Sequence, residues 1–195
     1  MDFVKTYGLV DKDDDHICET HPSVKAFSEK EACILMCKKN NFAYDYGYVT
    51  DGVYLYQYGG FNHNDAEKFP NFDPFKNPYI NPDNGEFDKF SKYLCTRDWY
   101  VKPCYTAKIN QIDKEIGCYE NIEGALRNSR YQAKKEYDKL KKHHFDISTI
   151  DTFATIYDPF GDKVGYIDVN GITYKKNTNG EFIVYSTHKF TNKKC

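Results

Sequence analysis

The sequence has no long apolar run, and no stretch approaches the roughly 18 to 20 consecutive apolar residues that a transmembrane helix requires. Residues 1–20 also lack the apolar core of a signal peptide and carry the acidic segment 11–15 instead. We therefore expect neither a membrane span nor a signal peptide in this chain. A mean hydropathy of -0.77 indicates a water-soluble globular protein.

Signatures of catalysis and of cofactor binding are missing as well. The chain contains no G-x-S-x-G, no H-E-x-x-H and no glycine-rich phosphate-binding loop. Segment 11–15 begins like a calcium-binding loop, but His16 stands where such a loop requires glycine, and no closing glutamate follows. We interpret the segment as an acidic loop and expect no cofactor from these motifs.

Neither sign of charge is in excess, because 27 Lys and Arg side chains oppose 29 Asp and Glu side chains for a net charge of -2. A balance this small gives no field that would steer the chain onto nucleic acid, so a nucleic-acid partner is not expected. The halves differ, since residues 1–100 carry a formal charge of -6 and residues 101–195 carry +4. This asymmetry is compatible with a two-part chain or with head-to-tail self-association.

The seven cysteines occupy positions 18, 33, 37, 95, 104, 118 and 195, and their odd number leaves at least one unpaired within the chain. The simplest oxidised arrangement pairs the other six and leaves Cys195 free or intermolecular. A disulfide framework is typical of an extracellular mature chain, whereas reduced thiols are typical of an intracellular or particle-associated protein. Both alternatives stay open.

One group of cysteines has the residue types and the spacing of a tetrahedral zinc site. Two residues separate Cys18 from His21, and three residues, about one helical turn, separate Cys33 from Cys37. The first pair is expected on a loop and the second pair on a helix. We keep zinc as an alternative that ranks below disulfides and below free thiols.

Aromatic residues make up 17% of the chain and dominate its first half. Ser28 and Glu31 form a capping box that predicts a helix ending near residue 40. Aromatic residues then occupy every second position in 42–48 and again in 54–58, and this alternation predicts a hairpin around Gly52. We prefer a three-residue loop, because that register gathers the tyrosines into one cross-strand ladder. The expected pairs, all candidate binding residues, are Tyr44 with Tyr58, Tyr46 with Tyr56, and Tyr48 with Tyr54.

Prolines recur every four residues from 70 to 82, within the aromatic segment 60–91. Each proline removes a backbone donor and forces its predecessor towards extended geometry, so the segment cannot be a helix or a central strand. We predict a long arm that lies along a neighbouring molecule and is anchored by aromatic side chains. The candidate anchors are Phe69, Phe72, Phe75 and Tyr79.

The last third of the chain has the clearest periodicity. Residues 119–142 predict an amphipathic helix whose polar face is basic. Three turn signals follow and separate four strands of an antiparallel meander. The predicted strands are 152–157, 164–169, 172–175 and 182–186.

These elements predict an α+β fold in three parts: a helix and hairpin lobe at 1–59, the arm at 60–91, and a lobe at 92–195 in which a helix packs on the meander. The leading hypothesis is a non-enzymatic protein-binding or assembly protein, such as a structural component of a virion or another large particle. Its partner would be another protein or a second copy of the chain. The alternatives are a secreted disulfide-linked module that binds a carbohydrate or a receptor, and an enzyme that uses a Cys/His pair.

Overall fold

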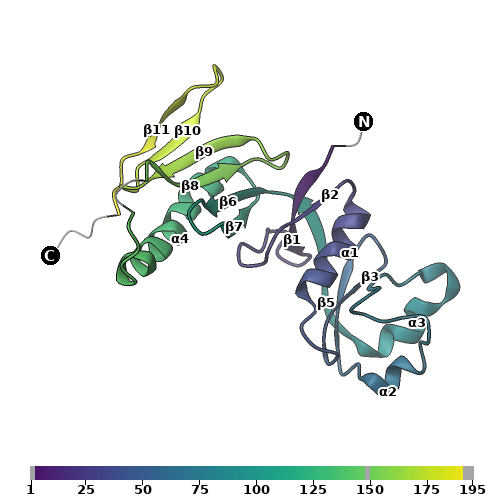
Figure 1. Cartoon of the computed structure of the whole chain (residues 1–195). Helices are drawn as coiled ribbons and strands as arrows, with labels where there is room; N and C mark the ends of the chain where they lie inside the picture. Colours follow the sequence, from purple (N-terminus) through teal and green to yellow (C-terminus); the bar gives the residue numbers. More distant parts are fainter. Residues whose placement is uncertain (1–2, 148–149, 191–195) are drawn as a thin grey trace. The chain divides into compact units, whose positions relative to one another are not determined.

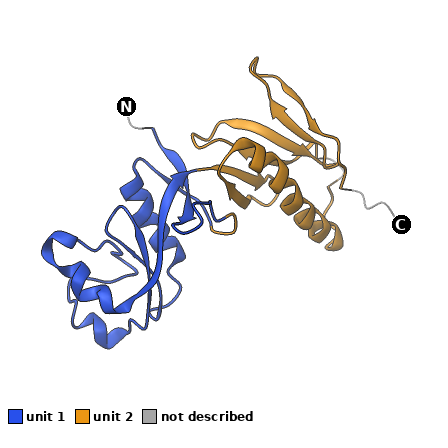
Figure 2. Ribbon diagram, turned by 180° about the vertical axis from the view of Figure 1, so that it is seen from behind, with its two compact units in different colours: residues 1–18, 22–103 blue, residues 19–21, 104–195 orange. Residues whose placement is uncertain are grey.

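The computed structural model describes residues 3–147 and 150–190 of the chain (Figure 1). Its contacts group the described residues into two units (Figure 2). Unit 1 holds the residues up to Cys18 together with Pro22–Pro103, and unit 2 holds Glu19–His21 together with the chain from Cys104 onward. The boundaries expected at residues 59 and 91 therefore both fall inside unit 1, and the division lies after Pro103 instead.

Unit 1 is built on an antiparallel sheet with the strand order β2-β1-β5-β4-β3. The strands are β1 Lys5–Asp11, β2 Val24–Ala26, β3 Tyr46–Thr50, β4 Leu55–Gly59 and β5 Leu94–Pro103. The ten-residue β5 occupies the centre, because it pairs with β1 through its second half and with β4 through its first half. The arm segment thus leaves the sheet after β4 and returns to it in β5.

One face of this sheet is covered by helix α1, Glu29–Asn40 (Figure 1). The predicted cap is confirmed, since the Ser28 hydroxyl accepts a hydrogen bond from the Glu31 amide at 3.2 Å. The helix buries a stripe of small and sulfur-containing side chains against the sheet. This first core contains Ala32, Cys33, Met36 and Cys37 of α1 with Leu9, Tyr48, Leu55, Trp99 and Val101 of the strands.

The opposite face is covered by the segment 60–93, which folds back onto its own sheet. The segment contains α2 His63–Ala66, the 3-10 turn η1 Pro82–Asn84, α3 Glu86–Phe90 and the 3-10 turn η2 Ser91–Tyr93. A second core joins it to the sheet and contains Val49, Tyr58, Phe61, Phe69, Phe72, Ile80 and Phe90. The segment was predicted as a long arm without secondary structure that lies along a neighbouring molecule, but its buried rings pack on its own sheet instead.

Local hydrogen bonds explain how this proline-punctuated segment can fold. The Asn62 side chain accepts from the Asp65 amide, and the Asn62 amide donates in return to the Asp65 carboxylate, which makes a capping box at the start of α2. Strand β3 also bonds to the segment, because the Thr50 amide donates to the Pro78 carbonyl at 3.0 Å and the Ile80 amide donates to the Thr50 carbonyl at 2.7 Å. Short turns thus provide hydrogen-bond partners for backbone groups in a segment whose prolines prevent a long helix or strand.

The hairpin β3–β4 forms, but in a register different from the expected one. Tyr48 pairs with Gln57, and Val49 pairs with Tyr56. The register differs from the expected one by an odd number of residues, so the tyrosines of β3 and those of β4 lie on opposite faces of the sheet. The loop 51–54 causes the shift, since one Asp51 carboxylate oxygen accepts from the amides of residues 53 and 54, each at 2.8 Å. The single-face tyrosine ladder was therefore wrong.

Unit 2 is a second antiparallel sheet with the order β11-β10-β9-β8-β6-β7, and the predicted C-terminal meander is confirmed in it. The strands are β6 Tyr105–Ile109, β7 Lys114–Tyr119, β8 Thr152–Tyr157, β9 Lys163–Asp168, β10 Thr173–Lys176 and β11 Phe182–Ser186. Strands β6 and β7 were not predicted, because the turn between them carries no glycine or proline. In this turn the left-handed backbone conformation is adopted by Asp113, with φ of 51°.

Helix α4, Ile122–Lys142, packs on one face of this second sheet (Figure 1). Its cap is Asn121, whose side chain accepts from the Gly124 amide at 2.8 Å. The helix buries Ala125, Leu126, Ser129 and Ala133 and exposes its basic face. Together the two units confirm an α+β fold. Within the part of the chain that the structure describes, no helix is long and apolar enough to cross a membrane.

The contribution of the arm to stability can be tested at Phe90, whose side chain is 1% exposed. The centroid of its ring lies 5.1 Å from that of Phe61 and 5.5 Å from that of Phe72. We expect Phe90→Ala to lower the free energy of unfolding by about 3 to 5 kcal/mol, because it leaves a cavity in a packed aromatic core. Urea titration measures the change. The matched control is Phe42→Ala, which removes a ring that is 74% exposed, and its cost is about 0.5 kcal/mol or less. Equal losses in the two variants would contradict the packing of the arm on the sheet.

Candidate functional site

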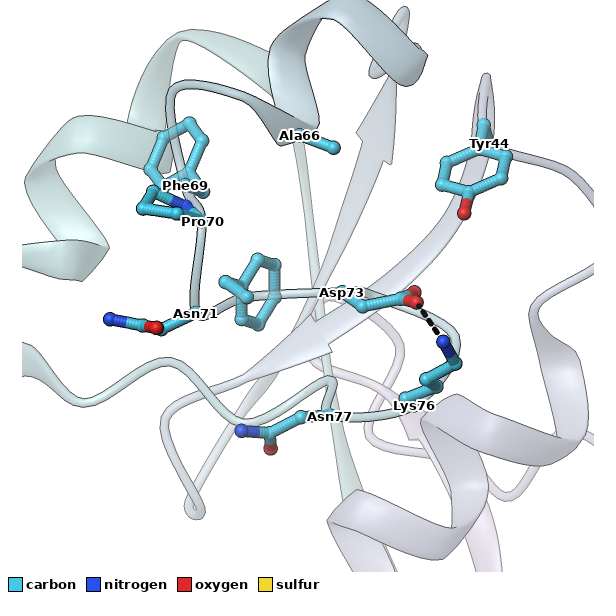
Figure 3. Close-up of a pocket in the computed structure, with 9 residues that line it drawn as sticks. Tyr44, Ala66, Phe69, Pro70, Asn71, Asp73, Lys76 and Asn77 are labelled. Atoms are coloured by element: carbon cyan, nitrogen blue, oxygen red, sulfur yellow. Dashed lines mark ion pairs between the residues drawn. The ribbon is translucent and has the colours of Figure 1, made fainter.

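A pocket of about 400 Å³ opens on unit 1 beside the segment 69–77 (Figure 3). It combines apolar walls with a few polar side chains, as ligand pockets do. Its lining residues are Tyr44, Ala66, Phe69, Pro70, Asn71, Phe72, Asp73, Lys76 and Asn77. Figure 3 shows Tyr44 on the opposite side of the pocket from Phe69 and Pro70.

A tight turn holds the polar side of this pocket in place. The Asp73 carbonyl accepts from the amides of Lys76 at 3.1 Å and Asn77 at 2.6 Å. The Asp73 carboxylate accepts from the Phe75 amide at 2.9 Å, and the Asn41 side chain donates to the Pro74 carbonyl at 2.7 Å. The backbone of the turn is therefore fixed by four hydrogen bonds.

The charges in the lining neutralise each other. Asp73 and Lys76 form an ion pair with 3.5 Å between the carboxylate oxygen and the ammonium nitrogen. Their side chains are 30% and 86% exposed, so water screens the pair and it adds little stability. The remaining polar groups among the side chains that line the pocket are the amides of Asn71 and Asn77 and the hydroxyl of Tyr44, all of them uncharged groups.

The pocket brings together three of the ten aromatic residues that were predicted to bind a partner: Tyr44, Phe69 and Phe72. The Tyr44 ring packs against His63 at 4.2 Å and against Phe75 at 4.5 Å. Phe69 and Phe72 are only 8% and 6% exposed, so most of each ring is used inside unit 1. These two rings therefore form part of the pocket wall and are not available as anchors for a partner.

The other seven predicted residues are dispersed over unit 1. Tyr48 and Tyr58 are buried on opposite faces of the sheet, and Tyr46 is 42% exposed at the edge strand β3. Tyr54 and Tyr79 each lie under a lysine ammonium group, and Tyr56 donates its hydroxyl hydrogen to Asp51 at 2.9 Å. The structure therefore contains no continuous aromatic platform on this hairpin.

The four residues of the predicted zinc site do not form a metal-binding group. Cys18, Cys33 and Cys37 belong to unit 1, whereas His21 belongs to unit 2. Among the residues with described positions, no three His, Cys, Asp or Glu side chains are grouped so that they could hold a metal ion. Burial lowers the pKa of His21, and its carbonyl accepts from the Cys118 thiol at 3.4 Å. The geometry thus gives zinc no support here.

No disulfide joins the described cysteines to one another, and these are all the cysteines except Cys195. Burial raises the pKa of Cys33 to about 12 and raises the pKa of Cys37 as well. A hydrogen bond to Cys104, together with burial, raises the pKa of Cys118. A thiol with a raised pKa is protonated at neutral pH and is a poor nucleophile, so these three cysteines are unsuited to thiol catalysis.

A separate candidate surface is the outer edge of β11 in unit 2, which residue-by-residue reasoning did not single out. Three consecutive side chains of this strand are exposed: Ile183 at 51%, Val184 at 52% and Tyr185 at 41%. β11 is the last strand in the sheet order, and no described strand pairs with its outer edge. The sequence carried a signal, since 182–186 is an uncharged strand with apolar residues at successive positions rather than alternate ones.

Thiol exposure predicts a definite alkylation pattern in a Cys195→Ser variant. In the native protein we expect iodoacetamide to modify the exposed Cys95 first, the half-buried Cys18 more slowly, and the buried cysteines last. After denaturation without reductant, all six thiols should react, and intact mass spectrometry counts them. Fewer than six modifications would show a disulfide and would contradict the free-thiol structure.

Comparisons with known proteins add no relative. No protein-family model, no curated protein and no solved structure matches the chain.

Proposed function

We propose that the chain is a non-enzymatic assembly protein that associates with a second copy of itself through the edge strand β11. The observation that carries the proposal is the uncharged strand Phe182–Ser186, which exposes Ile183 and Val184 and whose outer edge pairs with no described strand. An edge strand of this kind is a template for pairing with another chain, and natural proteins normally block it.

The other three sheet edges are blocked by recognisable means. β2 is only three residues long and carries Lys25 outward. β3 is capped by the backbone bonds of Thr50 to the arm. β7 begins with Lys114 and Glu115, and its pairing with β6 contains an irregularity. The strand β11 itself contains no charged residue, and no described strand pairs with its outer edge, which supports its use as a contact surface.

An antiparallel second copy suits this edge better than a parallel strand. Glu181 immediately precedes the strand, so two parallel copies would place their Glu181 carboxylates side by side, whereas antiparallel copies keep them apart. Phe182–Val184 pair regularly with β10, and the register shifts only beyond Val184. Self-pairing of Phe182–Val184 about Ile183 gives a two-fold contact, the commonest symmetry of soluble oligomers.

The arm no longer carries the assembly hypothesis, because its rings are packed inside unit 1. Association through β11 keeps the predicted class of function and moves the contact to unit 2. The Cys/His enzyme is less well supported, since the buried thiols with raised pKa values are Cys33, Cys37 and Cys118. The disulfide-linked module is less well supported too, because the described cysteines are free.

A charge-swap experiment at Val184 tests the proposal. In the antiparallel pair the two Val184 side chains lie on one face, one diagonal step apart, within reach of charged side chains. We expect wild-type protein to be a dimer in sedimentation equilibrium. Val184→Asp alone and Val184→Lys alone should each raise the dissociation constant by about tenfold or more, through like-charge repulsion and lost apolar burial. An equimolar mixture of the two variants should dimerise again.

The matched control is Val53→Asp, which introduces the same charge at a valine that is 63% exposed in the 51–54 loop of unit 1. It should leave the dimer unchanged. A monomeric wild-type protein, or a Val184→Asp protein that dimerises like the wild type, would overturn the proposal. A mixture that stays monomeric would exclude antiparallel pairing at Val184.

A further inference from the structure

The pocket of Figure 3 has a chemical character distinct from that of the β11 edge. Its apolar walls face each other, with Tyr44 on one side and Phe69 and Pro70 on the other, and its lining includes the exposed residues Asn71 and Asn77. Each amide can both donate and accept hydrogen bonds. The lining therefore fits a ligand that has an apolar face and a rim of groups that are donors and acceptors at once.

Charge narrows the class of ligand further. Asp73 and Lys76 are the charged residues of the lining, and they pair with each other at 3.5 Å. Because the two charges cancel, the lining offers no net electrostatic attraction to an anion or to a cation. The pocket thus favours an uncharged ligand, and phosphorylated compounds are disfavoured.

The surroundings also disfavour an extended peptide. Peptides commonly bind by adding a strand to an open sheet edge. The edge nearest in the fold, β3, already bonds through Thr50 to Pro78 and Ile80 of the arm. A compact ligand is left as the better occupant of a pocket of about 400 Å³.

From these observations we infer that the pocket is a binding site for a neutral saccharide. A pyranose ring has a face of C–H groups that packs on an aromatic or proline wall, and its hydroxyl groups both donate and accept. The ring would pack on the apolar wall while Asn71 and Asn77 bond to its hydroxyls. The turn at 73–77 is held by its own hydrogen bonds, so little ordering would oppose binding. This site is independent of association through β11.

The test uses the full chain and three probes: methyl β-glucoside, methyl β-galactoside and N-acetylglucosamine. We expect saturation-transfer NMR to show contact with at least one of them, and titration to give its dissociation constant. The double variant Asn71→Ala/Asn77→Ala should weaken that probe by about tenfold or more, because each lost hydrogen bond costs about threefold to tenfold. Both amides are exposed, so the variant should keep the stability of the wild type.

Two further variants separate binding from folding. Asn179→Ala removes an exposed amide from a turn of unit 2 and should bind the probe like the wild type. Tyr44→Phe keeps the ring and should retain binding, whereas Tyr44→Ala should lose it. No transfer to any of the three sugars, or equal binding by the double variant and the wild type, would overturn the inference. Displacement of the sugar by inorganic phosphate would overturn it too, because it would show an anion site.

Discussion

The burial of aromatic rings on both faces of the first sheet is the constraint on which unit 1 depends. Exposure of an apolar sheet face to water is unfavourable, so both apolar faces of this five-stranded sheet must be covered. Helix α1 covers only one of them. The second face is closed by the arm, through rings that pack edge-on or tilted around Phe90. The pocket beside Tyr44 exists because the turn at 73–77 is held where that aromatic layer meets solvent.

Unit 2 solves the same problem with a single helix. α4 packs against the strands from β6 to β10, so the core formed with Phe153, Ile156 and Ile167 is closed on that side. β11 is the outermost strand, beyond the buried stripe of the helix, and its apolar side chains stay half exposed. A sheet wider than the helix that covers it leaves an edge, and an edge without charge favours pairing with another strand.

The candidate sites were only partly accessible to sequence reasoning. Tyr44, Phe69 and Phe72 were predicted as binding residues and do line the pocket, but the signal was aromatic abundance, which buried rings share. Asn71 and Asn77 carried no signal, because an asparagine in a proline-rich segment is ordinary turn chemistry. The zinc prediction treated spacing along the chain as proximity in space, and among the described residues no three such side chains are grouped to hold a metal ion.

The sequence by itself determined the local elements: the capped helix after Ser28, the basic helix 122–142, and the strands that glycine turns separate in the C-terminal meander. These depend on neighbours within a few residues, where capping, periodicity and turn preference act. Only the tertiary structure decided the hairpin register, the folding of the arm and the placement of β5 between β1 and β4. Each of these depends on contacts between residues far apart in the chain. A local pattern of aromatic residues is the same whether the rings are buried within their own chain or bind another molecule.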